Sequence, residues 1–166
     1  MVPTLFDSIQ AREDIVAARI IDGKALAQQV RERLAVESAA VLAKTGVKPG
    51  LATILVGDDP ASHVYVRNKQ KACELAGIYV DDHKLPASTT QAELLALIEK
   101  KNADPKIHGI LVQLPLPKHI SEANVLAVID PMKDVDGLTE ASAGKLMLGK
   151  PGLRPCTPVG CVILAR

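Results

Sequence analysis

A serine, a tyrosine and a lysine recur at helical spacing in SHVYVRNKQK, residues 62–71. Successive residues of a helix are rotated by about 100°, which puts Ser62, Tyr65 and Lys69 on one face and Lys71 opposite it. A lysine in a cleft loses hydration, which disfavours its charged form and allows proton transfer near neutral pH. The spacing of Tyr65 and Lys69 is also typical of two ordinary surface residues. The functional interpretation is a proton-transferring Lys69, with Tyr65 stacked on a flat ligand ring.

A glutamine followed by prolines ends the apolar segment GILVQLPLP, residues 109–117. Ligands of open α/β sheets bind beyond the carboxyl ends of the strands, and Gln113 is expected there. Its amide group offers both an acceptor and donors. On these residues alone, an amide that satisfies a loop backbone is the favoured role, and a ligand contact is the alternative.

Two further motifs carry weaker chemical signals. DVDG, residues 134–137, places two carboxylates in one turn, but no histidine or cysteine cluster supports a metal site, so no metal is predicted. Cys156 in PCTP has no histidine placed as an obvious base. A buried thiol in a rigid loop is therefore favoured over a nucleophile.

The elements that must position these residues alternate along the chain. Helices are expected at 24–45, from about 60 to 77, at 89–104 and at 121–129, and strands at 51–57, 78–85 and 107–114. This order predicts an α/β protein of three layers, α/β/α, with a mostly parallel sheet and helices on both faces. Residues 131–160, rich in Gly and Pro, are expected to be mostly irregular, before a helix that begins with CVILAR.

Helix phase predicts which residues pack inward. For 24–45, Gly23 and Gly46 are the predicted caps. The predicted core positions of that helix are Leu26, Val30, Leu34, Val41 and Leu42. In the helix that carries Lys69, the predicted apolar arc is Val64, Ala72, Leu75 and Ala76. Lys69 is expected on the shoulder of that arc.

The composition of the 166 residues argues against several classes of protein. A formal net charge of +1 without a basic run argues against binding to a nucleic-acid backbone or a membrane surface, and 2% aromatic residues are too few for a stacking platform. No stretch approaches the ~20 apolar residues of a membrane span. The acidic N-terminal residues do not fit a secretory signal or a transit peptide. Three cysteines without a C-x-x-C pair favour reduced thiols, and a cytoplasmic location is predicted.

Five motifs in one order carry a family resemblance: IDGKALAQ, VGDDPASHVYVRNKQKACELAGI, GILVQLPLP, PMKDVDGLT and PCTPVG. On these motifs, from about Ile20 to the last residue, the chain resembles the bifunctional methylenetetrahydrofolate dehydrogenase/methenyltetrahydrofolate cyclohydrolase family. Any one motif would be modest evidence, whereas five in sequence are highly specific. The resemblance implies the fold of the catalytic domain of that family.

The resemblance also implies roles for the motif residues. Lys69 is the implied central catalytic group, Tyr65 the ring that stacks on the folate, and Gln113 the partner that hydrogen-bonds the lysine and helps to set its protonation. The implied substrate-binding residues are Ser62, Tyr65, Gln113, Pro115 and Asp136. Among these, Asp136 would bind the amino and ring nitrogen groups of the pterin. The residues implied to lie near the cofactor are Cys156, Thr157 and Pro158.

The implied chemistry has two linked steps. Hydride leaves the one-carbon bridge of 5,10-methylenetetrahydrofolate for a nicotinamide cofactor, usually NADP, and water then opens the methenyl ring to give 10-formyltetrahydrofolate. A permanently charged lysine would repel the methenyl cation, whereas a desolvated one exchanges protons with the attacking water. The implied partners are tetrahydrofolate one-carbon derivatives, and the full-length family protein is implied to be a homodimer.

Two departures from the family pattern bear on activity. Ser142 stands where the family commonly has asparagine, and the chain stops six residues after Gly160, before any glycine-rich Rossmann turn. The predicted division is a folate-binding catalytic domain over 1–160 and, over 161–166, the start of a helix towards an absent nucleotide domain. No NADP-dependent oxidation is expected from this chain alone. The alternative function is a non-catalytic folate-binding or interaction module.

Overall fold

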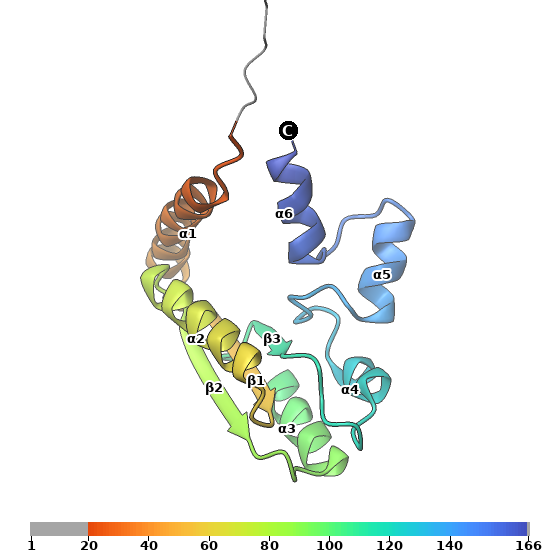
Figure 1. Ribbon diagram of the computed structural model, residues 1–166. Coiled ribbons are helices and arrows are strands. Elements are labelled where there is room, and N and C mark those ends of the chain that lie inside the picture. The colour runs from red at the N-terminus through yellow and green to blue at the C-terminus, as the bar shows by residue number, and fades with distance from the viewer. Residues whose placement is uncertain (1–19, 166) are drawn as a thin grey trace, which may run out of the picture.

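The computed structural model describes residues 20–165, except for the side chains of residues 60, 61 and 63. Its parallel sheet has the strand order β2-β1-β3, with α2 on one face and α3 on the other (Figure 1). The strands are β1 (Gly50–Val56), β2 (Tyr79–Leu85) and β3 (Gly109–Val112). The helices are α1 (Gly23–Thr45), α2 (Pro60–Leu75), α3 (Gln91–Ala103), α4 (Glu122–Val128), α5 (Glu140–Met147) and α6 (Cys156–Leu164). The predicted α/β/α fold with a parallel sheet is confirmed.

The central strand β1 separates an apolar core from the face that carries the candidate site. Ala52, Ile54 and Val56 are buried with Leu94 of α3 and Val125 of α4 in one apolar cluster. Because strand side chains alternate between faces, the intervening residues of β1 point towards α2. The same alternation puts Ile110 and Val112 of β3 in the apolar cluster. By the same alternation the next side chain, Gln113, points towards α2.

The turn between β1 and α2 has the residues that such a turn requires. Gly57 adopts a left-handed backbone conformation with φ 94°. Asp59 is the N-cap of α2, where its side chain accepts from the Ser62 N–H, and Pro60 occupies the first turn. The predicted strand, turn and helix are confirmed here.

Helix α1 begins and packs differently from the prediction. Its N-cap is Asp22, whose carboxylate accepts from the Ala25 N–H at 2.9 Å, so Gly23 is the first helical residue and not the cap. The aspartate side chain supplies a hydrogen-bond acceptor that glycine lacks. Gly46 is the C-cap in a left-handed conformation, as predicted.

The predicted core positions of α1 are largely wrong. Leu34, Val41 and Leu42 are exposed, and Ser38 is the buried residue of this helix. The Ser38 hydroxyl donates to the Gly77 carbonyl at 3.4 Å, just beyond the end of α2. A small side chain at this point brings the two helices close together over a narrow stripe. The apolar positions on either side of that stripe therefore remain uncovered.

The segment expected to be irregular contains two helices, α5 and α6. Thr139 is the N-cap of α5, and Glu140 is in its first turn. α6 begins at Cys156, earlier than the predicted start at Cys161. Pro158 does not prevent this, because the N–H groups of a first helical turn have no partner within the helix. Among the helices of residues 20–165, none has the length and hydropathy to cross a membrane.

Candidate functional site

Helix α2 turns Lys69 towards the sheet. A stripe at spacings of three and four contains the fully or partly buried residues Ser62, Val66, Lys69, Cys73 and Ala76. The predicted apolar arc is confirmed for Ala76, which is buried, and partly for Ala72, but it is wrong for Val64 and Leu75, which are exposed. Val66 and Cys73 face the sheet instead, and Lys69 lies between them within the buried face, not on its shoulder. Lys71 is exposed, as predicted.

Lys69 and Gln113 meet across the gap between α2 and the end of β3. Lys69 Nζ donates to Gln113 Oε1 at 3.1 Å. Gln113 Nε2 donates to the Leu114 carbonyl at 2.7 Å, and the Gln113 backbone N–H donates to the Ile54 carbonyl at 2.8 Å. Because the amide nitrogen is already bonded to a carbonyl, the amide oxygen is held facing the lysine. The glutamine thus satisfies a loop backbone and contacts Lys69 at the same time.

A cavity of about 500 Å³ lies beside this pair. The predicted site residues that line it are Lys69, Gln113, Asp136, Cys156, Thr157 and Pro158. Apolar and backbone atoms of Val112, Leu114, Leu138 and Pro155 complete the lining. The volume is in the range of small-molecule sites, and a few polar groups converge on a mainly apolar wall.

Asp136 gives the cavity a carboxyl group whose ionisation is disfavoured. Burial raises the pKa of Asp136; the nearby Lys69 ammonium opposes this, and the Asp134 carboxylate adds to it. The net result is a pKa of Asp136 above its ordinary value. Among the described residues, the Asp136 carboxyl has no hydrogen-bond partner, so its oxygens are available to a ligand.

The backbone of the turn that carries Asp136 packs against the backbone just before α6. Gly137 has φ 65°, and a Cβ built on it would lie 2.9 Å from the Arg154 carbonyl carbon and from the Pro155 nitrogen. Any side chain here would push the two segments apart. The DVDG turn and the start of α6 therefore form two adjoining walls of the cavity.

Other predicted residues lie outside the lining of this cavity. Tyr65 is 59% exposed on α2, and Ser62 is buried in the first turn of that helix. Pro115 is exposed and follows a cis peptide bond with Leu114. Their substrate roles stay predictions. Cys156 corrects the expectation of a buried thiol in a loop, because it is an exposed residue at the start of α6.

A buried polar group behind the turn was missed in the sequence. Asp134 is 1% exposed, and it accepts from the backbone N–H groups of Leu138 at 3.2 Å and Thr139 at 2.8 Å. Burial opposes its ionisation, but the hydrogen bonding around the carboxylate, first that of the Thr139 backbone, outweighs it, so the pKa of Asp134 lies below its ordinary value. The available signal was TEAS: a threonine followed by a glutamate and a serine is typical of a helix N-terminus.

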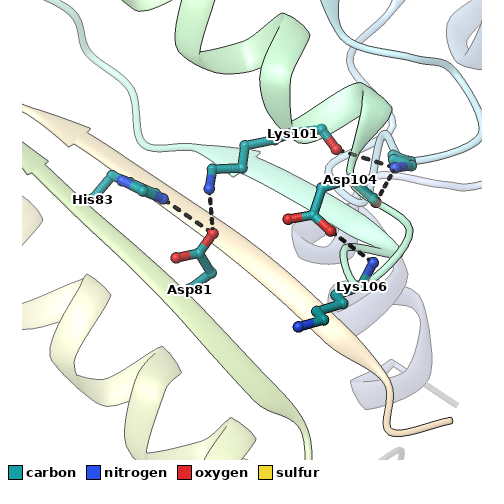
Figure 2. Close-up of polar contacts among 6 residues, drawn as sticks. Asp81, His83, Lys101, Asp104 and Lys106 are labelled. Carbon is teal, nitrogen blue, oxygen red and sulfur yellow. Dashed lines mark hydrogen bonds and ion pairs between the residues drawn. The ribbon is translucent and has the colours of Figure 1, made fainter.

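A second unpredicted cluster lies on the opposite face of the sheet, away from the cavity. Figure 2 shows Lys101 of α3 and His83 of β2 pointing to the same Asp81 carboxylate, at 2.6 Å and 3.1 Å from Asp81 Oδ2. Burial opposes ionisation of Asp81, but the Lys101 and His83 bonds outweigh it, so the pKa of Asp81 lies below its ordinary value. This cluster joins α3 to β2. Within residues 20–165, no three His, Cys, Asp or Glu side chains are grouped as metal ligands would be.

Comparison with known proteins decides the family. A family model described as the catalytic domain of tetrahydrofolate dehydrogenase/cyclohydrolase matches residues 21–136. The chain belongs to the tetrahydrofolate dehydrogenase/cyclohydrolase family. The match covers the segment from the start of α1 to Asp136 and so includes Lys69 and Gln113. The family resemblance drawn from the five motifs is confirmed.

Close relatives within the tetrahydrofolate dehydrogenase/cyclohydrolase family are similar over half their length. The bifunctional protein FolD of Caulobacter vibrioides (strain NA1000 / CB15N) is 58% identical over 149 residues, which is 90% of this chain and 50% of that protein. The crystal structure of the FolD methylenetetrahydrofolate dehydrogenase/cyclohydrolase from Campylobacter jejuni is 47% identical with a TM-score of 0.85, over 88% of this chain and 52% of that one. The chain spans about half the length of the curated relatives it matches.

A second similar structure contains ligands. It is the methylenetetrahydrofolate dehydrogenase-cyclohydrolase (FolD) of Trypanosoma brucei complexed with NADP cofactor and inhibitor. It is 36% identical with a TM-score of 0.86, over 89% of this chain and 50% of that one. The fold is therefore shared over most of the length of this chain.

Proposed function

We propose that this chain supplies the folate site of a bifunctional methylenetetrahydrofolate dehydrogenase/methenyltetrahydrofolate cyclohydrolase in one-carbon metabolism. The observation that carries the proposal is the hydrogen bond of 3.1 Å between Lys69 Nζ and Gln113 Oε1, at the edge of a cavity that also contains Asp136. The names of the similar proteins supply the substrate class, 5,10-methylenetetrahydrofolate and its methenyl product.

Lys69 is the proposed proton carrier of the hydrolytic step. Its bond to the fixed Gln113 oxygen holds Nζ at the cavity wall. A neutral Lys69 accepts a proton from the water whose oxygen attacks the cationic methenyl carbon. The bond from that carbon to one ring nitrogen then breaks, and the nitrogen takes up a proton as the formyl group forms. This exchange requires the uncharged form of the lysine, which does not repel the methenyl cation.

Asp136 and Tyr65 are the proposed substrate-orienting residues. The ionised Asp136 carboxyl would accept hydrogen bonds from the amino and ring N–H groups of the pterin, which compensate for the burial of its charge. Tyr65 lies one helical turn before Lys69 and is 59% exposed, so its ring is accessible to a flat ligand above the cavity. We assign Ser62 and Pro115 to the surroundings of the same bound folate.

The start of α6 fits the nicotinamide end of a dinucleotide. Pro155 caps α6 without a side-chain hydrogen bond, so the first N–H groups of the helix lack that partner beside the cavity-lining Thr157. Cys156, Thr157 and Pro158 would hold this end of the cofactor. Bound NADP would supply the hydride acceptor for the first reaction. Residues 20–165 contain no G-x-G-x-x-G turn before a helix for the pyrophosphate.

The proposed division of labour follows from this partial fit. In this proposal residues 1–160 belong to the folate-binding catalytic domain, and α6, which ends at Leu164, would lead towards a nucleotide-binding domain. We place that domain, and the contacts of a homodimer, in the half of the relatives that this chain does not span. The proposed location of the protein is the cytoplasm, where folate one-carbon units are its small-molecule partners.

The function is tested by two measurements on the purified chain. Tetrahydrofolate binding is followed by calorimetry, and hydrolysis of 5,10-methenyltetrahydrofolate by the loss of its absorbance. We expect Lys69→Met to lower the hydrolysis rate by roughly 10²–10⁴-fold, the usual effect of a general acid–base group. Lys71→Met is the matched control, because this exposed lysine lies on the opposite side of the same helix.

Three outcomes distinguish the possibilities. Hydrolysis that requires Lys69 but not Lys71 supports the proposed function. Tetrahydrofolate binding without hydrolysis identifies a non-catalytic folate-binding module. Equal losses in both lysine variants at equal thermal stability would contradict the assignment of Lys69.

A further inference from the structure

The turn that carries Asp136 is held by hydrogen bonds to the buried carboxylate of Asp134. Asp134 Oδ2 accepts from the Thr139 N–H at 2.8 Å and Asp134 Oδ1 from the Leu138 N–H at 3.2 Å. These bonds close a loop over the intervening residues, among them Asp136. The Thr139 hydroxyl donates to the Ser142 hydroxyl at 3.2 Å and accepts from the Ser142 N–H at 3.3 Å, which joins the loop to the first turn of α5.

The segment before the loop is tied to the sheet and to α3. The Ile110 N–H of β3 donates to the Lys133 carbonyl at 2.7 Å, and Ile110 and Asp134 form an isolated parallel bridge. Lys133 Nζ donates to the backbone carbonyls of Lys101, Asn102 and Asp104 at 3.1, 2.7 and 3.0 Å. The chain is thus held before Asp134 by β3 and α3, and after Gly137 by the Asp134 carboxylate.

Asp136 itself has no hydrogen bond among the described residues that would fix its side chain. Its direction is consequently set by the backbone of the turn, and the turn is set by the bonds to Asp134. We propose that Asp134 is a positioning residue for the folate site: through the Leu138 and Thr139 amides it closes the turn that holds the Asp136 carboxyl in the cavity beside Lys69. This inference rests on the proposed function for the identity of the ligand.

The electrostatics agree with this geometry. Besides burial, the Asp134 carboxylate contributes to raising the pKa of Asp136. The same group therefore holds the turn and disfavours charge on Asp136 until a ligand with N–H donors arrives. The groups that act on Asp136 are Lys69 from α2 and Asp134 from the turn itself.

The first test needs no folate. We would follow the Asp136 carboxyl carbon of the ligand-free chain by NMR as a function of pH, in the wild type, Asp134→Asn, Thr139→Val and Thr139→Ser. The expected pKa of Asp136 falls towards its ordinary value in Asp134→Asn, which loses both the charge and one acceptor. Thr139→Val keeps the Asp134 charge but loses the hydroxyl, so a fall there reports the opening of the turn. Thr139→Ser retains the hydroxyl and is expected to retain the wild-type pKa.

The second test measures the affinity for tetrahydrofolate by calorimetry. Asp134→Asn is expected to raise the dissociation constant by roughly tenfold, as for the loss of one hydrogen bond to a charged group. Thr139→Val loses the hydroxyl contacts with Ser142 and is expected to raise the dissociation constant by less. Asp130→Asn is the matched control: Asp130 Oδ1 also accepts from a nearby backbone amide, that of Met132 at 2.9 Å, but outside the cavity lining. It is expected to leave the affinity unchanged.

The two tests separate this inference from the proposed function. If both Asp134→Asn and Thr139→Val lower the melting temperature but leave the pKa of Asp136 unchanged, Asp134 is structural only and the inference is wrong. If the wild type does not bind tetrahydrofolate, the proposed function fails, while the NMR titration still decides the role of Asp134. A variant too unstable to titrate is replaced by Ser142→Ala, which removes only the outermost hydroxyl and is expected to lower the pKa of Asp136 by less.

Discussion

At the scale of single residues, the carboxyl of Asp136, proposed above to bind the ligand, illustrates how a buried acidic group costs stability. Its pKa is raised, first by burial, so the folded chain binds more protons than the unfolded chain between the ordinary and the raised value. The free energy of unfolding therefore falls as pH rises through that interval, and the loss persists above it. An unliganded chain at neutral pH is thus less stable than it would be without this charge.

The first prediction at this scale is that Asp136→Asn stabilises the ligand-free chain. The melting temperature is expected to rise at about pH 7 and to change little at about pH 3, where the carboxyl is protonated in both states. Differential scanning calorimetry at the two pH values provides the measurement. Glu99→Gln is the control, because Glu99 is exposed on α3. Equal shifts at both pH values would show that burial of the Asp136 charge is not the cause.

Sequence patterns identified candidate residues of the site but not which of them meet in space. The spacing of Ser62, Tyr65 and Lys69 predicted a common helix face, and Lys71 is exposed as expected. Lys69 and Gln113 are separated by 44 residues, so their hydrogen bond depends on how α2 crosses the sheet. That crossing is a property of tertiary packing, which a local pattern does not contain. Family resemblance supplied the pairing that periodicity alone left open.

At the scale of elements, Lys101 fastens α3 to β2. Its side chain is 8% exposed and its ammonium lies 2.6 Å from Asp81 Oδ2 (Figure 2). The pKa of Asp81 is below its ordinary value because the Lys101 and His83 bonds outweigh the opposing effect of burial. Stability from this group is therefore present above the ordinary pKa and is lost as pH falls through the lowered one.

We predict that Lys101→Met destabilises the chain by roughly 3 kcal/mol at about pH 7, because it leaves the partly buried Asp81 carboxylate without its closest cation. The difference in free energy of unfolding between the wild type and the variant is expected to become smaller in acid, where Asp81 is protonated in the variant. Urea unfolding at several pH values measures it. Lys100→Met is the neighbouring control, since Lys100 is exposed. A deficit independent of pH would instead point to lost packing of the lysine stem.

Strands were predicted from the sequence more reliably than helices because their signal is local. β1 is a nearly continuous apolar run and is buried along almost its whole length. α5 was missed and α6 was predicted to begin too late, because Gly144, Pro158 and Gly160 resemble breakers. Pro158 lies in the first turn of its helix, and a Cβ at either glycine would have open space around it. For α1, the pattern identified apolar positions correctly but not whether a neighbouring segment covers them. Leu34 and Val41 are the residues on which that prediction failed.

At the scale of the whole molecule, the described residues divide into a part with a buried apolar core and a part, α6, without buried residues. The buried apolar cluster lies between β1, β3, α3 and α4, whereas α6 has no buried residue. Figure 1 shows α5 and α6 beyond the β3 side of the sheet, with the end of α6 beside the beginning of α1. Regions with few buried apolar side chains open at a lower free energy than the core.

Hydrogen exchange is predicted to follow this division. Amides of β1 are expected to exchange last, in global unfolding, and those of α6 first, in local opening. Mass spectrometry of exchanged peptides provides the measurement. Saturating tetrahydrofolate should slow exchange in α6 and in the DVDG turn, because both line the proposed binding cavity. Equal protection of α6 and β1 without ligand would mean that α6 unfolds only with the core.

The backbone contact at Gly137 acts as a fixed spacer for the cavity. Main chain meets main chain there, so no side chain determines the width of the opening between the DVDG turn and α6. Substitutions at Leu138 or Thr157 would alter the chemistry of the wall without changing that width. The dimension of the cavity and its chemical preference can then diverge independently during evolution. A lineage that kept this glycine would retain the aperture while its ligand selectivity changed.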